Sequence, residues 1–149
     1  MTQNPRSTAQ VAGHPIHPML VAFPAAFLVA TPICDIVFWR TTNPSWSIAA
    51  LWLLGVAVAV GVIAAVAGFV DFMGDSRIRR LPDAWRHMIG NTIVLSLSLL
   101  NWFCRYVFGN EAVLPWGLTI SLLVFLILFY TGWSGWQMVY RHGVGVADR

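Results

Sequence analysis

Histidine is the residue type in this chain with the clearest capacity for chemistry. The sequence has four histidines: His14, His17, His87 and His142. Histidine is the commonest metal ligand in proteins and a usual axial ligand of haem. The helix boundaries given below place all four near one membrane face, together with Asp71. These five residues are therefore candidate metal ligands, although histidines at a membrane interface often bond only to the backbone or to lipid headgroups.

A second interpretation of the same residues is a haem site. His17 and His87 are predicted at matching depth on two helices, as ligation of one iron by two histidines requires. Asn91 follows His87 by one turn and is placed to orient an imidazole or a haem propionate. Gly68 and Gly135, on the other two helices, are expected to leave space for a flat cofactor.

Signatures of other chemistry are absent from the sequence. There is no H-E-x-x-H zinc signature, no glycine-rich phosphate loop, no serine nucleophile elbow and no paired-carboxylate motif. The two cysteines, Cys34 and Cys104, lie inside apolar segments without metal-ligand spacing, and whether they form a disulfide stays open. No catalytic residue is assigned, and whether the chain is an enzyme stays open.

The composition indicates the class of protein in which these residues act. Of 149 residues, 58% are hydrophobic and 10% are charged, and the mean hydropathy is +0.69. Soluble domains carry roughly 45–50% apolar and about 25% charged residues. The formal net charge of +3 comes from arginines between apolar runs, which is typical of membrane-protein loops and forms no basic face for nucleic acid. The chain is predicted to be a small polytopic membrane protein.

Four apolar segments are long enough to cross a bilayer core of roughly 30 Å as helices. They cover about residues 18–39, 46–70, 85–108 and 116–140. The connecting loops are too short for a second domain, so residues 1–149 are predicted to form one domain. The predicted fold is all-α, a bundle of four transmembrane helices in the lipid bilayer, and its oligomeric state stays open.

Arginines in the loops predict the orientation of this bundle. With four crossings, both termini and the charged loop Gly74–Pro82 share one side. That side carries seven arginines: Arg6, Arg77, Arg79, Arg80, Arg86, Arg141 and Arg149. The opposite side carries only Arg40 and Arg105. Both termini, and with them the histidines, are predicted on the cytoplasmic side of a bacterial inner membrane.

The spacing of polar residues also predicts an ion pair. His17 and Asp35 are 18 residues apart, as are His87 and Arg105, and the two helices that carry them run the same way. Asp35 and Arg105 therefore share a depth, and an unpaired charge inside a membrane is costly, so the two are predicted to pair. The offset of 70 also relates Cys34 to Cys104 and Trp46 to Trp116. Shared membrane constraints explain so few matches better than a duplicated two-helix unit does.

Several motifs of this chain resemble those of one protein family. They are the opening HPIHPMLVAFP at His14–Pro24, AGFVD at Ala67–Asp71, Arg86-His87 with Asn91, and YRHGVGV at Tyr140–Val146. This pattern is similar to an uncharacterised bacterial membrane-protein family, domain of unknown function 2231, over essentially the whole chain. The resemblance implies a four-helix membrane fold and no established activity. Some relatives are joined to Rieske-type iron–sulfur domains, which implies redox work, although this chain has no signature for such a cluster.

The leading functional hypothesis is a redox-linked membrane subunit. It would hold haem b or a divalent metal ion near the cytoplasmic face and serve a redox partner protein. Two other hypotheses remain: a non-catalytic accessory or assembly subunit, and a small transporter with a His–Asp proton relay between His87 and Asp71.

Overall fold

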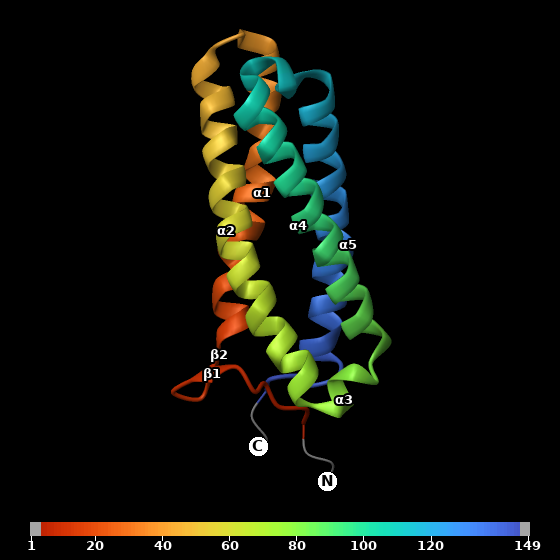
Figure 1. Ribbon diagram of the computed structural model, residues 1–149. Coiled ribbons are helices and arrows are strands. Elements are labelled where there is room, and N and C mark those ends of the chain that lie inside the picture. Colours follow the sequence, from red (N-terminus) through yellow and green to blue (C-terminus); the bar gives the residue numbers. More distant parts are fainter. Residues whose placement is uncertain (1–3, 147–149) are drawn as a thin grey trace.

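The computed structural model describes residues 4–146, and long helices make up most of it (Figure 1). The long helices are α1 (Ile16–Thr41), α2 (Pro44–Gly74), α4 (Pro82–Phe108) and α5 (Leu118–Tyr140). The short elements are β1 (Gln10–Val11), β2 (His14–Pro15), α3 (Ser76–Arg79), η1 (Gly109–Ala112) and η2 (Val113–Gly117). Arg149, one of the seven arginines used to predict the orientation, lies outside the described residues.

Local chemistry explains where the helices begin and end. The side chain of Asn43 accepts a hydrogen bond from the Ser45 amide, and Pro44 occupies the first turn of α2, so the second helix begins two residues earlier than predicted. The loop predicted at 74–82 contains α3, which Asp75 caps by accepting from the Arg77 amide. The Arg77 guanidinium also bonds this carboxylate and holds the pKa of Asp75 well below its usual range.

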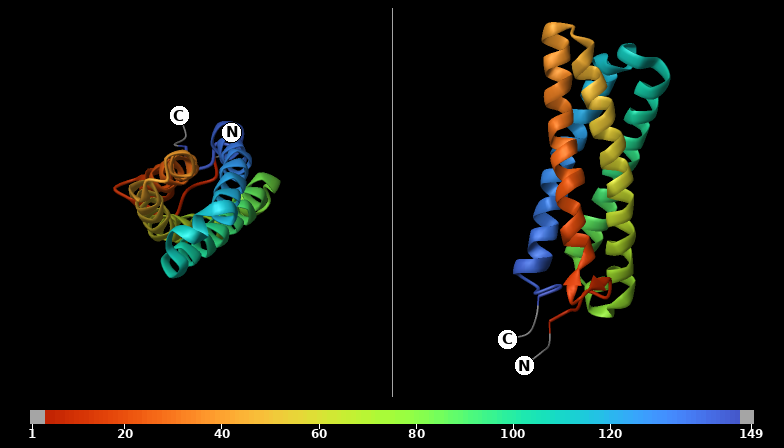
Figure 2. Two further views of the ribbon diagram at one scale, coloured as in Figure 1. Left: turned by 90° about the horizontal axis from the view of Figure 1, so that it is seen from above. Right: turned by 90° about the vertical axis from the view of Figure 1, so that its left-hand side faces the viewer.

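The four long helices form a ring in the order α1, α2, α4, α5. Helix α1 packs along α2, and α4 packs along α5, while α2 against α4 and α5 against α1 close the ring. Helices α1 and α4 therefore lie on one diagonal of the bundle, which Figure 2 shows from above. Side chains that point inward from these two helices can meet at the centre.

Apolar side chains fill the core of the bundle and also cover much of its outer surface. A buried cluster at the centre contains Leu28, Leu54 and Val94 from three different helices. Large apolar side chains such as Trp52 and Phe129 are 69% and 65% exposed on the outside. Within residues 4–146, three helical stretches are long and apolar enough to cross a membrane: Ile16–Thr41, Pro44–Gly74 and the stretch Pro82–Tyr140, which contains both α4 and α5. An apolar exterior of this kind is suited to lipid rather than water.

Both ends of the described chain lie at the same end of the bundle, beside α3 and the β1–β2 hairpin (Figures 1 and 2). A hydrogen bond joins the two terminal segments: the Gly145 amide donates to the Pro5 carbonyl over 2.9 Å. The N-terminal segment is also fixed to α2. The carboxylate of Asp71 accepts from the amides of Thr8 and Ala9, each over 2.7 Å. We call this the terminal end, and the opposite one the far end.

Candidate functional site

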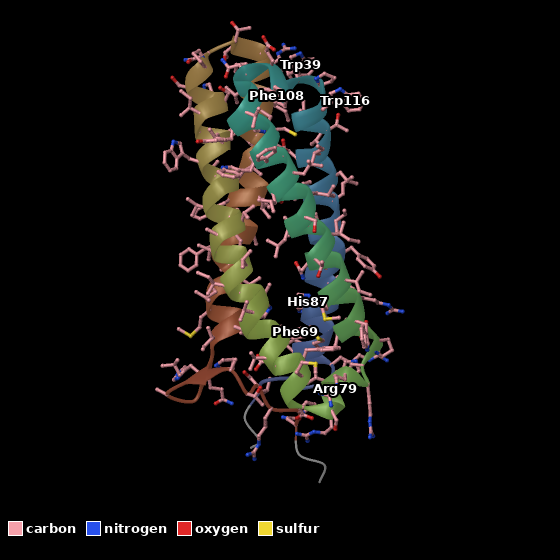
Figure 3. All side chains as sticks on the ribbon, in the orientation of Figure 1. Trp39, Phe69, Arg79, His87, Phe108 and Trp116 are labelled. Atoms are coloured by element: carbon pink, nitrogen blue, oxygen red, sulfur yellow. The ribbon has the colours of Figure 1, made fainter. Side chains whose placement is uncertain are left out.

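Two of the four histidines meet inside the bundle. The rings of His17, from α1, and His87, from α4, have centroids 5.8 Å apart and planes at 85°. Figure 3 places His87 in the half of the bundle that includes the terminal end. The two rings touch because their helices lie on the diagonal of the bundle. We call this pair the imidazole pair.

Each ring of the imidazole pair bonds to the backbone of a neighbouring helix. The Nδ1 atom of His17 lies 2.7 Å from the carbonyl oxygen of Ala64, and Nδ1 of His87 lies 2.9 Å from that of Thr131. A carbonyl oxygen can only accept, so both Nδ1 atoms must carry the proton and donate it. In the neutral rings, each Nε2 therefore keeps a free lone pair.

Two glycines allow the rings to lie this close to the backbone. A Cβ added to Gly68 would stand 2.9 Å from Nδ1 of His17, and one added to Gly135 would stand 3.0 Å from Nδ1 of His87. The expectation that these glycines leave space for a flat cofactor is therefore wrong. The imidazole rings themselves fill that space.

The cavity beside His17 is small, and His87 is not among the residues that line it. It measures about 50 Å³ and is lined by His17, Asn91 and apolar side chains that include Val21 and Leu95. Sites that hold cofactor-sized ligands measure about 300–1,000 Å³, whereas a cavity needs only about 10–15 Å³ of such space to hold one water. Haem therefore does not fit between these helices as they are packed. The cavity has room only for small molecules such as water.

Asn91 lies next to the imidazole pair but does not orient either ring. Its amide nitrogen donates to the carbonyl oxygen of His87 over 2.8 Å, a contact within α4. The described contacts leave the side-chain oxygen of Asn91 without a donor. Asn91 is one of the residues that line the cavity beside His17.

The other three predicted metal ligands have partners of their own. His14 is exposed in β2, and its Nδ1 bonds to the carbonyl of Ala12. His142 lies with Nε2 3.4 Å from the carboxylate of Asp83. Asp71 holds the N-terminal segment. Within residues 4–146, no three His, Cys, Asp or Glu side chains gather to hold a metal ion, so the set of five does not form one site.

A second polar cluster lies toward the far end. Arg105 donates to both carboxylate oxygens of Asp35, over 2.6 and 2.8 Å, and both side chains are almost completely buried. The residue spacing predicts that these two residues share a depth in the membrane and form an ion pair. Two more side chains complete the cluster: Asn101 accepts from Arg105 Nε, and the Ser121 hydroxyl donates to Asp35. The sequence did not single out Ser121, because the hydroxyl of a serine in an apolar helix usually donates a hydrogen bond to a backbone carbonyl of the same helix.

Two thiols and one serine hydroxyl take no part in these two clusters. Cys34 and Cys104 are both free thiols, so they form no disulfide. The hydroxyl of Ser98 is buried without a hydrogen-bond partner. It lies on α4, as His87 and Asn101 do, and two turns beyond Asn91, which lines the small cavity.

The two halves of the bundle hold their histidines in the same way. In each half, a histidine near the start of one helix bonds a carbonyl of the next helix and packs on a glycine four residues beyond that carbonyl. The geometry is therefore repeated as well as the residue spacing.

Comparisons with curated proteins and with solved structures found no match. One family does match, and it is described as a predicted membrane protein, DUF2231. The match covers residues 13–148, from just before β2 to beyond the end of α5. The chain therefore belongs to the DUF2231 family of predicted membrane proteins.

Proposed function

We propose that this protein crosses a bacterial inner membrane four times and binds one divalent transition-metal ion at the imidazole pair. The observation that carries the proposal is that both rings are fixed through Nδ1 to main-chain oxygens. Histidines that bind metals usually donate their other ring nitrogen in this way, because the contact fixes the tautomer and the ring orientation. The free Nε2 atoms of His17 and His87 would bind the ion.

The remaining coordination would come from small ligands. Imidazole nitrogens suit Zn²⁺, copper, iron and nickel. The cavity beside His17 has room for water, and Asn91 is among the residues that line it. A bound copper or iron ion would supply one-electron redox chemistry, which a redox-linked subunit with a redox partner protein would need. The chain's own part is to fix both imidazoles.

The proposed four crossings follow from the lengths of the helices. The two shortest of the four long helices have 26 and 23 residues, or roughly 39 and 35 Å at 1.5 Å per residue. Each exceeds a hydrocarbon core of roughly 30 Å. An even number of crossings also agrees with both ends of the chain lying at one end of the bundle. The arginine count supports a cytoplasmic position for that end.

The test is metal binding by four matched variants. Purified protein should bind one Zn²⁺ or Cu²⁺ per chain in equilibrium dialysis. His17→Ala and His87→Ala should each abolish this binding, whereas His14→Ala and His142→Ala should leave it unchanged. Equal losses in all four variants, or no binding by the unaltered protein, would overturn the proposal.

The two alternative functions would give other results. A proton relay between His87 and Asp71 has less support, because Asp71 already accepts several bonds from the N-terminal segment. It would appear as proton flux into liposomes that Asp71→Asn reduces. An accessory or assembly subunit would bind no metal, yet its loss would lower the amount of a partner complex in the membrane.

A further inference from the structure

A separate polar pocket opens at the terminal end, between the start of α4 and the last turns of α5. Its volume is about 410 Å³. The lining side chains are Arg86, Tyr130, Trp133, Ser134, Gln137 and Arg141, together with Asp83. We propose that this pocket binds the phosphate headgroup of an anionic phospholipid from the adjoining leaflet.

The charges in the pocket favour an anion. Both oxygens of Asp83 are already engaged, by Arg86 over 3.0 Å and by His142 at 3.4 Å. Arg86 still has more than half of its side chain exposed. Among residues 4–146, Arg141 takes part in no ion pair and is exposed. An arginine in this state can bind a phosphate through two parallel hydrogen bonds.

The aromatic side chains favour a lipid over a free anion. Tyr130 and Trp133 are 55% and 63% exposed on the outer surface of α5. Tyrosine and tryptophan are enriched where lipid headgroups meet acyl chains. Trp133 also stacks on Trp136, with ring centroids 5.4 Å apart. The same wall thus offers cations at one end and an interfacial aromatic surface at the other.

The length of the pocket wall agrees with a lipid. From Tyr130 to Arg141 a helix rises roughly 16 Å. The headgroup layer of a bilayer leaflet is only about 5–8 Å thick. The wall therefore extends past the headgroup layer, so that an acyl chain would lie along Tyr130 while the phosphate contacts Arg141. Free phosphate would contact only the end of this wall near Arg141.

Native mass spectrometry of the full-length protein tests the proposal. It would measure binding of the first phosphatidylglycerol and, as a zwitterionic comparison, the first phosphatidylcholine. Arg141→Gln should weaken phosphatidylglycerol binding about five-fold, the effect of one basic residue near an anionic membrane surface. It should leave phosphatidylcholine binding unchanged. Arg80→Gln, which alters an exposed arginine at the same end outside the pocket, is the matched control and should change neither.

Three results would overturn the proposal. They are equal affinity for the two lipids, an equal loss from Arg80→Gln, and displacement of phosphatidylglycerol by millimolar inorganic phosphate. Arg86→Gln repeats the test if Arg141→Gln does not yield folded protein. Metal binding at the imidazole pair is not involved, so the two proposals fail independently.

Discussion

At the scale of single residues, backbone oxygens determine how His17 and His87 are presented. The carbonyls of Ala64 and Thr131 take the Nδ1 protons, and both rings lie against glycines of the same two helices. His14 and His142 lack this arrangement, since one is exposed and the other lies beside a carboxylate. Chemically identical side chains are therefore expected to behave differently because their partners differ.

This presentation predicts the effect of adding one methyl group. Gly135→Ala would place a Cβ 3.0 Å from the His87 ring and displace it from the Thr131 carbonyl. Metal affinity should fall about ten-fold or more, as it does when an outer contact of a ligand histidine is lost. Isothermal titration calorimetry would measure the change.

Gly132→Ala on the same helix is the matched control. A Cβ at position 132 has nothing within 4 Å, so metal affinity should not change. Alanine is the better helix former, so neither variant should melt much earlier than the unaltered protein. Equal affinities of the two variants would contradict the role assigned to Gly135.

Part of the site could be predicted from residue spacing alone. The 18-residue separations in the two parallel helices gave His17 and His87 one depth, and Asp35 and Arg105 another. The carbonyls of Ala64 and Thr131 could not be predicted, because every residue has a carbonyl and only packing selects one. The bonds between Asp71 and the N-terminal segment could not be predicted either, because the sequence does not define the path of this polar segment.

At the scale of helices, Asp35 and Arg105 connect the diagonal pair α1 and α4. Removal of one partner leaves a buried charge, so Asp35→Ala and Arg105→Ala should each destabilise the protein by about 3–5 kcal/mol. The double variant should lose clearly less free energy of unfolding than the two single variants lose together. Reversible unfolding in detergent micelles would measure all three free energies. Additive losses would show that the two charges are stabilised separately.

The N-terminal segment is predicted to depend on one side chain of α2. Asp71→Ala removes the acceptor of the Thr8 and Ala9 amides, and bonds to a charged group are worth about 1.5–3 kcal/mol. Hydrogen exchange at these two amides should speed up about ten-fold or more, while α1 and α2 stay protected. Asp83→Ala changes an acid at the same end and should leave both amides slow. Fast exchange in both variants would argue against the anchor.

The sequence predicted the long helices better than the short elements. Uninterrupted apolar runs gave all four long helices, with ends within about four residues. The hairpin β1–β2 and helix α3 were missed, since elements of two to four residues leave no periodic pattern. The fourth helix begins two residues later than predicted, because η2 occupies Val113–Gly117.

At the scale of the whole molecule, membership of a membrane-protein family agrees with the apolar exterior of the bundle. The arginine distribution then predicts which end faces the cytoplasm. A reporter enzyme that works only outside the cytoplasm should be active when fused near Asn43, between α1 and α2. It should be silent when fused to the C-terminus. The reverse pattern would place the imidazole pair near the outer face.

The central claim is that His17 and His87 together bind one metal ion through nitrogen. X-ray absorption of Zn²⁺-loaded protein tests this most directly, because it reports the type, number and distance of the ligand atoms. We predict two imidazole nitrogens at about 2.0–2.1 Å, with oxygen in the remaining positions. Sulfur at about 2.3 Å, or fewer than two imidazoles, would contradict the account.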